Sequence, residues 1–337
     1  MSKTAVNIVF GTMTFGEKGI EGVRTSDPKE AQAILDTFKK HGHRDLDSAR
    51  IYGNGTTEEL LGELNWEDQG FEMHTKLYPT KSKNLKIFSL QYTHEPEDVR
   101  RATMDSLKAL GTKKVDLLYL HGPDRTVPFE DTVREVNKLH EEGYFNRFGL
   151  SNFMSWEVAQ ICEICKKNGW IMPTVYQGIY NALHRAIEPE LIPCLRHYGI
   201  ALYCFQPLAG GFLTSRYKRN MSEQDYEPGS RFDPKRMQGQ LHHGRYMNDV
   251  YLDALDIIRE VAKKHNLTEI ECAFRWLSHH SQLSREKGDS IIIGASSVEQ
   301  LEKNLAELEK GPLPEEMVQA LDNAYLKVNG VVPKYFH

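Results

Sequence analysis

Two kinds of hydrophobic pattern alternate along the chain. Short runs rich in β-branched and aromatic residues predict strands, and longer stretches whose apolar residues recur every three or four positions predict amphipathic helices. The expected strands span residues 7–13, 43–46, 72–75, 115–120, 147–150, 174–176, 200–204 and 290–293. The expected helices span residues 29–40, 58–64, 96–110, 129–142, 156–167, 189–197 and 298–308, with one more at 315–326.

Residues that start and stop helices support these boundaries. Asp27 followed by Pro28 is typical of a helix start, and Pro128, Ser155 and Glu188-Pro189 mark others. Glycines stand where helices are expected to end, at Gly42, Gly111, Gly143 and Gly169.

Eight strands, each followed by a helical crossover, predict an α/β fold, a (β/α)₈ TIM barrel with an extra C-terminal helix. A doubly wound sheet is the alternative. It usually opens with G-x-G-x-x-G after the first strand, whereas this chain has Gly11-Thr12-Met13-Thr14-Phe15-Gly16. Two stretches break the rhythm, residues 79–94 and a long loop after strand seven, 206–248. We find no internal repeat and no linker, so residues 1–337 are expected to form a single domain.

Composition narrows the class of protein. The 337 residues include 42 basic and 47 acidic side chains, for a net charge of -5. Without a basic stripe, neither nucleic acid nor an anionic membrane is an expected partner. No apolar run of about 18 residues is present. The first residues lack the apolar core of a signal peptide, and five scattered cysteines favour reduced thiols, so a cytoplasmic location is expected.

Candidate chemistry lies at the carboxyl ends of the expected strands, where barrel enzymes place their active sites. Asp47 and Tyr52 follow the second strand, Lys76 follows the third, and His121 follows the fourth. Later strand ends present Ser151 and Asn152, Gln177, residues 205–211 and residues 294–297.

The first four of these side chains suit the reduction of a carbonyl group. The ordinary pKa of tyrosine is about 10, and Lys76 is expected to lower the pKa of Tyr52 by stabilising tyrosinate. Asp47 would keep Lys76 charged and oriented, and His121 would donate a hydrogen bond to the carbonyl oxygen. Tyr52 would protonate that oxygen while a hydride reaches the carbon, and positioned acid catalysis is typically worth about 10²–10⁴-fold.

Two histidine pairs invite comparison with metal sites. His242-His243 and His279-His280 lack a third ligand at metal spacing, so no metal site is predicted. Asp45 lies one strand period before Asp47 and is expected to be a solvated or paired carboxylate.

From end to end, the chain resembles an aldo-keto reductase. The matching segments are Asp47-Ser48-Ala49-Arg50-Ile51-Tyr52, Thr75-Lys76, Leu120-His121, Gly149-Leu150-Ser151-Asn152-Phe153, Gln177 and Asn304. The resemblance implies a catalytic tetrad of Asp47, Tyr52, Lys76 and His121. It also implies NADPH bound extended across the barrel mouth.

The resemblance further implies residues along the cofactor. From the nicotinamide outward they are Ser151, Asn152, Gln177 and Asp47 near the carboxamide, Phe205 for stacking, Gln206, Leu208, Gly210 and Leu213 along the pyrophosphate, and Ser296, Ser297, Gln300 and Asn304 toward the adenosine. The last group opens a helix, and a helix N-terminus suits anions.

A narrower resemblance, to the aflatoxin-aldehyde reductase branch, comes from residues 207–211, 275–283, 296–301 and 333–336. That branch reduces aldehydes and dicarbonyls, including succinic semialdehyde, with NADPH and forms dimers, so a homodimer is expected. Arg231 matches a loop arginine that could bind the 2′-phosphate. Arg245-Tyr246 matches a pair that can hold a substrate carboxylate, and Met13 is also expected to contact substrate beside Tyr52 and His121.

Two other functions remain open. A dedicated biosynthetic reductase for a bulky substrate would fit the altered stretches at 79–94 and 242–244. The second of these functions is a redox-sensing binding subunit without catalysis, like the channel β-subunits that share this fold. Those subunits often carry an extra N-terminal segment, whereas this chain begins a few residues before its first expected strand.

Overall fold

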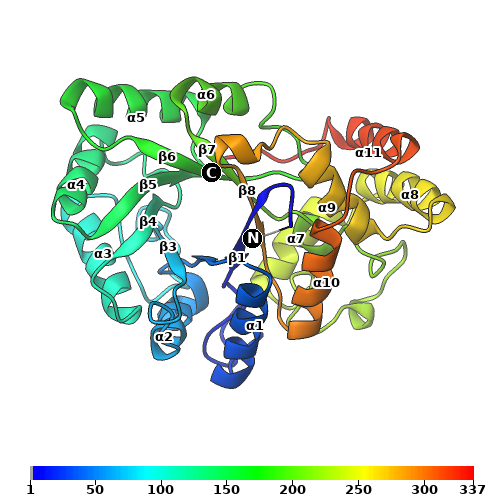
Figure 1. Cartoon of the computed structure of the whole chain (residues 1–337), viewed down its shortest axis with the longest axis horizontal. Helices are drawn as coiled ribbons and strands as arrows, with labels where there is room; N and C mark the ends of the chain where they lie inside the picture. The colour runs from blue at the N-terminus through cyan, green and yellow to red at the C-terminus, as the bar shows by residue number, and fades with distance from the viewer. Residues whose placement is uncertain (1–2) are drawn as a thin grey trace.

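The computed structural model describes residues 3–337, and within them eight parallel strands form a closed barrel. Each strand pairs with its neighbour in sequence, and β8 closes the barrel against β1 (Figure 1). The strands are β1 (Asn7–Gly11), β2 (Asp45–Asp47), β3 (Glu72–Leu77), β4 (Val115–Leu120), β5 (Phe145–Ser151), β6 (Pro173–Ile179), β7 (Ala201–Phe205) and β8 (Ser290–Ile293). The predicted TIM barrel is confirmed.

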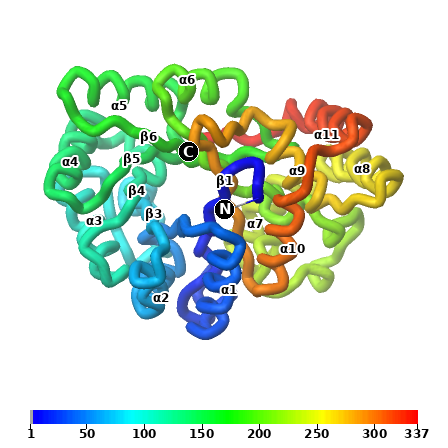
Figure 2. Tube along the Cα trace, viewed as in Figure 1, coloured from blue at the N-terminus to red at the C-terminus, as the bar shows by residue number. Residues whose placement is uncertain are grey.

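Helices surround the strands (Figure 2). They are α1 (Pro28–Lys40), α2 (Thr56–Glu63), α3 (Pro96–Ala109), α4 (Phe129–Glu141), α5 (Ser155–Asn168), α6 (Leu191–Tyr198), α7 (Met237–Tyr246), α8 (Asp249–Lys264), α9 (Glu269–His279), α10 (Val298–Leu308) and α11 (Glu315–Val328). The start of α1 is as expected, because Asp27 accepts a 2.8 Å hydrogen bond from the Lys29 amide and Pro28 opens the helix. The extra C-terminal helix, α11, packs against α8.

The barrel has two apolar layers. A large one lies between strands and helices, and a small one fills the barrel with Val9, Leu117, Tyr119, Val175, Ala201, Tyr203 and Ile292. Successive strand side chains point to opposite faces, so every second residue faces inward. Lys76 is in register with Tyr119, and Gln177 with Ser151 and Tyr203. The same inward rows that fill the barrel therefore end in the candidate site residues.

Several boundaries differ from the expected ones. β1 ends at Gly11 rather than residue 13, β2 runs from Asp45 to Asp47 rather than 43–46, and β3 continues to Leu77. Asp47 and Lys76 are consequently held in strands, not in the loops after them. The helix expected at Pro189 begins two residues later, at Leu191.

The expected long loop, 206–248, contains a helix. α7 carries Arg245 and Tyr246 and was not predicted, because its Gly, Gln and His residues give it a weak apolar face. α8 and α9, which also lie between β7 and β8, were not among the expected helices either. That residues 1–337 form one domain stays a prediction.

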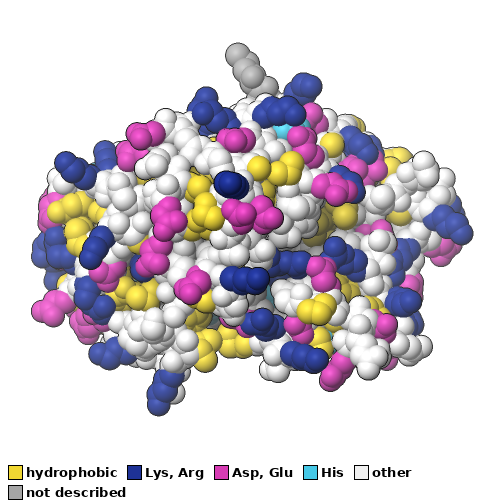
Figure 3. All heavy atoms as spheres, turned by 90° about the horizontal axis from the view of Figure 1, so that it is seen from below, with side chains coloured by type: hydrophobic (Ala, Val, Ile, Leu, Met, Phe, Trp, Pro, Cys, Tyr) yellow, Lys and Arg dark blue, Asp and Glu magenta, His cyan; other side chains and the backbone are white. Residues whose placement is uncertain are grey.

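The face in Figure 3 mixes basic and acidic side chains without a broad region of one sign. Within residues 3–337, no helix is both long and apolar enough to cross a membrane.

Candidate active site

Lys76 is the centre of the site. Its Nζ donates hydrogen bonds to Oδ2 of Asp47 at 2.6 Å, to the main-chain oxygen of Ser48 at 2.5 Å and to the Tyr52 hydroxyl at 3.3 Å. Lys76 and Asp47 are both buried. The structure thus brings together three of the four predicted catalytic side chains in direct contact.

The second oxygen of Asp47 is also occupied. Nε2 of Gln177 donates a 2.7 Å hydrogen bond to Oδ1 of Asp47 across the barrel. With both oxygens engaged, Asp47 has a fixed orientation toward Lys76. The same hydrogen bond fixes the side chain of Gln177. It uses Nε2 of Gln177 and not the side-chain oxygen.

The pKa values of Lys76 and Tyr52 are set by burial and by the neighbouring charges. Burial lowers the pKa of Lys76, but Asp47 and Tyr52 raise that pKa further, so it lies above its usual value. For Tyr52, burial raises the pKa more than Lys76 lowers it, with Asp47 raising it as well. The expected net lowering of the Tyr52 pKa is therefore wrong, because loss of water around the phenolate outweighs the neighbouring cation.

His121 lies beside Tyr52 with the two ring planes nearly perpendicular, at 80° and 5.8 Å between centroids. Burial and the charge of Lys76 hold the pKa of His121 well below its usual value, so the imidazole is neutral. Its Nδ1 has no hydrogen-bond partner among residues 3–337. A neutral imidazole carries one N–H, which can be donated to an oxygen in the mouth.

A buried ion pair fixes the turn that carries Tyr52. Nη1 of Arg50 lies 2.6 Å from the fully buried carboxylate of Glu58, to which the Thr75 hydroxyl also donates. Gly53 and Asn54 both adopt left-handed backbone angles just after Tyr52. The turn is thus held by β3 and α2, although Arg50 was recognised only as part of a sequence motif.

The predicted carboxamide residues lie at adjacent strand ends. Asn152 has a left-handed φ of 63°, and its Nδ2 donates to the main-chain oxygen of His121 at 2.8 Å and to the Ser151 hydroxyl at 3.1 Å. Phe205 ends β7, two residues along the inward row from Tyr203. Amides, a hydroxyl and an aromatic ring thus occur at the ends of β5, β6 and β7, which suits a nicotinamide ring.

The chain after β7 forms a tight turn, named the cradle below, where the pyrophosphate is predicted to lie. Gln206, Ala209, Gly210 and Gly211 all have positive φ, and the main-chain amides of Ala209 and Gly211 each donate a 2.9 Å hydrogen bond within the turn, to the oxygens of Gln206 and Leu208. A Cβ on Gly210 would lie 2.4 Å from Cδ2 of His242. The His242 ring therefore packs directly on Gly210, and the role of this turn in binding the pyrophosphate stays a prediction.

The start of α10 is a capped helix N-terminus. The Ser297 hydroxyl accepts a hydrogen bond from the Gln300 amide at 3.2 Å, and Oε1 of Gln300 accepts one from the Ser296 amide at 2.9 Å. Nδ2 of Asn304 lies 3.4 Å from the main-chain oxygen of Gly294. The polar first turn fits a phosphate or ribose, but these side chains also satisfy one another.

The two loop arginines have different neighbours. Arg231 lies with Nη2 3.8 Å from the sulfur of Met13, and its charge interacts with Tyr52. Nη1 of Arg245 and the hydroxyl of Tyr246 lie 3.5 and 3.2 Å from Oε1 of Gln206. Neither arginine forms an ion pair within the described chain. The predicted contact of Arg231 with the 2′-phosphate and the predicted contact of Arg245-Tyr246 with a substrate carboxylate both stay predictions.

The sequence did not single out Tyr78, Tyr119 or His337, which all lie near the site. Tyr119 is buried under Lys76, where Gly149 leaves room for its ring. Tyr78 contacts both His121 and His337. The inward alternation of β4 could have identified Tyr119, but no local pattern links Tyr78 to a residue 259 positions away.

The histidine pairs bond to main-chain groups. His242 and His243 lie 2.8 and 2.9 Å from the oxygens of Gln238 and Phe232. His279 is likewise 2.7 Å from the Lys310 oxygen.

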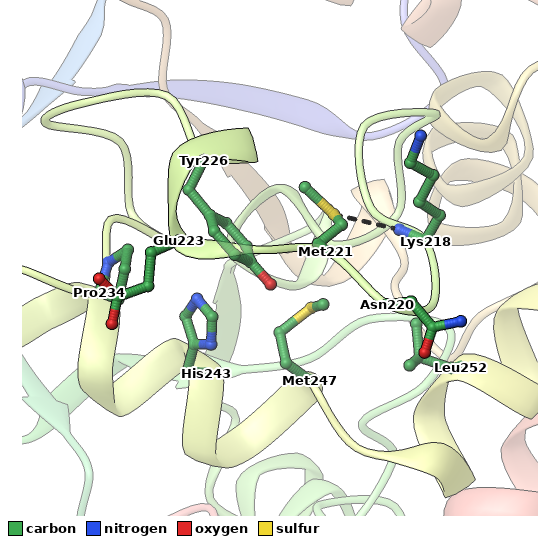
Figure 4. Close-up of a pocket in the computed structure, with 9 residues that line it drawn as sticks. All are labelled: Lys218, Asn220, Met221, Glu223, Tyr226, Pro234, His243, Met247 and Leu252. Carbon is green, nitrogen blue, oxygen red and sulfur yellow. Dashed lines mark hydrogen bonds between the residues drawn. The ribbon is translucent and has the colours of Figure 1, made fainter.

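A hollow of about 360 Å³ lies in the long loop, among Lys218, Asn220, Met221, Glu223, Tyr226, Pro234, His243, Met247 and Leu252 (Figure 4). None of the four predicted catalytic residues lines it.

A comparison with known proteins decides the family. The sequence profile described as "Aldo/keto reductase family" matches residues 7–326. The chain belongs to the aldo/keto reductase family. Its members are oxidoreductases that act on carbonyl groups with a nicotinamide cofactor, and this chain is an oxidoreductase of that kind.

Individual relatives extend over nearly the whole chain. "Aldo-keto reductase pigE" of Monascus ruber is 54% identical over 336 residues, covering 99% of this chain and 98% of that protein. "Aflatoxin B1 aldehyde reductase member 2" of Mus musculus is 40% identical, covering 97% and 87%. "Oxidoreductase sirO" of Leptosphaeria maculans is 34% identical, covering 97% and 96%. The resemblance to the aflatoxin-aldehyde branch is confirmed.

Proposed function

We propose that this aldo/keto reductase uses NADPH to reduce an aldehyde or ketone to the alcohol, with Tyr52 as the proton donor. The observation that carries the proposal is the bonded row of Asp47, Lys76 and Tyr52 beside a neutral His121. The polar groups at the ends of β5 and β6, the cradle after β7 and the start of α10 support a dinucleotide across the barrel mouth.

When bound, the reduced nicotinamide supplies a hydride to the carbonyl carbon. Neutral His121 donates a hydrogen bond to the carbonyl oxygen and fixes its direction. Tyr52, whose pKa lies above its usual value, is protonated before reaction and gives its proton to that oxygen as the O–H bond of the alcohol forms. Lys76 stabilises the tyrosinate that remains, and Asp47 keeps Lys76 charged. A proton from solvent restores Tyr52.

Substrate selection is proposed to involve the unpaired loop cations. Arg231 lies beside Met13 and Arg245 beside Tyr246, and within residues 3–337 neither arginine pairs with a carboxylate. A substrate with an anionic group would neutralise this charge. The homodimer and the cytoplasmic location stay predictions.

The test is an assay of the purified chain with NADPH and a panel of aldehydes and ketones, with the alcohol identified by mass spectrometry. We expect carbonyl-dependent oxidation of NADPH and one alcohol formed per NADPH consumed. Tight NADPH binding with no turnover on any member of the panel, together with co-purification of a membrane partner, would favour a redox-sensing subunit instead. Turnover confined to bulky ketones would favour a dedicated biosynthetic reductase.

A further inference from the structure

The hollow of about 360 Å³ in the long loop, named the loop hollow here, lies apart from the catalytic row. Its lining comes from residues 218–226 and Pro234 of the loop, from α7 through His243 and from the start of α8 (Figure 4). His242, the residue before His243, packs on Gly210 of the cradle instead. The loop hollow therefore shares α7 with the cradle but contains none of the cradle residues.

The two sides of the loop hollow are held in place by the chain itself. Oδ2 of Asp225 accepts hydrogen bonds from the Ser222 amide at 2.7 Å and from the Ser222 hydroxyl at 3.0 Å, which fixes the turn before Tyr226. On the helix side, Nε2 of His243 lies 2.9 Å from the main-chain oxygen of Phe232. The rings of Tyr226 and His243 meet at 4.4 Å between centroids. The hollow is therefore formed before any ligand arrives, as small-molecule sites usually are.

Tyr226 supplies a free polar group to the loop hollow. The residue is only 9% exposed, and its hydroxyl points into the hollow toward Met247 (Figure 4). Within residues 3–337 that hydroxyl has no hydrogen-bond partner. Burial and the nearby Asp225 raise the pKa of Tyr226, so the phenol is protonated at neutral pH and can donate. Because a buried hydroxyl without a partner is costly, an oxygen acceptor on a ligand would be favoured at this point.

The rest of the lining favours a flat, uncharged ring. The side chains of Met221 and Met247 both line the hollow, and thioether sulfur packs favourably at the edge of aromatic rings. Leu252 adds an apolar surface. The exposed Lys218 and Glu223 carry charges of opposite sign, so neither a cation nor an anion is selected. A volume of about 360 Å³ lies within the range of ligand sites and holds a single substituted ring.

We propose that the loop hollow is an accessory binding site for small uncharged phenols, in which the Tyr226 hydroxyl bonds the phenol oxygen and the ring packs against Met221 and Met247. The site is separate from the catalytic row, so this inference does not depend on the proposed function. A methyl group in place of the phenol oxygen would keep the packing and lose the hydrogen bond. Phenol and toluene, which have the same shape, therefore distinguish the polar contact from simple filling of a hollow.

The test is calorimetric titration of the full chain with phenol and with toluene. We expect saturable binding of phenol with a dissociation constant on the order of 1 mM, a value within reach of so small a ligand. Tyr226→Phe should lower the preference for phenol, which is the ratio of the toluene to the phenol dissociation constant, by about 5-fold, the value of one neutral hydrogen bond. Leu252→Trp, which fills the hollow, should remove binding of both compounds. Tyr325→Phe, which removes a hydroxyl outside the hollow, is the matched control and should leave the preference unchanged.

Two results would overturn the site. One is the absence of saturable phenol binding below about 10 mM. The other is a phenol preference that is the same in the wild type and in Tyr226→Phe. In that case Tyr52→Phe shows where the ligand lies, because loss of the preference there would place phenol in the catalytic mouth. Tyr226→Phe keeps the ring and its contact with His243, so the variant is expected to fold, and circular dichroism checks this.

Discussion

The side-chain amide of Gln177 donates a 2.7 Å hydrogen bond to Asp47, on the carboxylate oxygen that Lys76 leaves free. A single carboxylate therefore orients both the lysine of the proton-transfer row and a residue predicted to hold the nicotinamide. Because the buried Asp47 carboxylate orients both Lys76 and Gln177, the site should hold the hydride donor and the proton donor at a constant distance from each other.

Replacing Gln177 with Leu should weaken NADPH binding and slow turnover. We expect NADPH affinity to fall about 5-fold, because one hydrogen bond between neutral groups contributes about 1 kcal/mol. We expect kcat to fall as well, because Asp47 is less constrained. NADPH fluorescence titration and steady-state kinetics measure the two effects. Gln32→Leu, on the outer face of α1, is the control. Unchanged affinity would remove Gln177 from the cofactor site.

The pH profile of reduction should follow from the raised pKa of Tyr52. The donor must be protonated, so the rate is full below its pKa and falls only as pH rises through that pKa, which lies above the ordinary value of about 10. We expect kcat for reduction to be flat between about pH 6 and pH 9. A decline centred below about pH 8 would show that Tyr52 titrates lower than its burial implies, or that another group is the acid.

Gly210 and Gly211 offer a matched pair for the cradle after β7. Both have positive φ, 72° and 106°, but a Cβ at Gly210 meets His242 whereas none of the neighbouring atoms lies within 4 Å at Gly211. Gly211→Ala should therefore cost about 1–3 kcal/mol of stability from backbone strain alone. Gly210→Ala should cost more and also weaken NADPH binding, as thermal melts and titration would show. Equal effects of the two changes on NADPH affinity would argue against the cradle.

His41 should make stability depend on pH. Its ring lies 2.8 Å from Glu302 and 3.1 Å from Glu309, joining the end of α1 to α10. Burial lowers the pKa of His41, but the two glutamates raise it above its usual 6.5 overall. The ion pairs therefore contribute fully below about pH 6.5 and are lost as pH rises through the folded-state pKa.

His41→Ala should consequently lower the free energy of unfolding by roughly 1 kcal/mol more at about pH 6 than at about pH 9. Urea denaturation at the two pH values measures the difference. Lys40→Ala removes an exposed amine 3.4 Å from the same Glu302 and is the control, which should show no such difference. A cost of His41→Ala that is the same at both pH values would mean the pair is not charged.

The sequence was sufficient for the barrel, because the strand and helix patterns alternate clearly along the chain. It also singled out Asp47, Lys76 and Tyr52 at successive strand ends, which the structure brings into contact, although their catalytic role stays a prediction. It could not supply the sign of the Tyr52 pKa shift, which depends on how much water the fold excludes. It also could not supply the contact of Tyr78 with His337, since that contact joins distant segments through side chains alone. The helix α7 was missed for a different reason, its weak apolar periodicity.

The most direct measurement of the central claim is turnover and NADPH affinity of Tyr52→Phe, determined on the same preparation beside Tyr325→Phe. Tyr325 is a control because its hydroxyl bonds to the exposed Asn329 at the end of α11. The account predicts that Tyr52→Phe loses about 10²–10⁴-fold in kcat, the value of a positioned acid, while its NADPH affinity stays within about twofold of the wild type. Normal kcat in Tyr52→Phe would contradict the account.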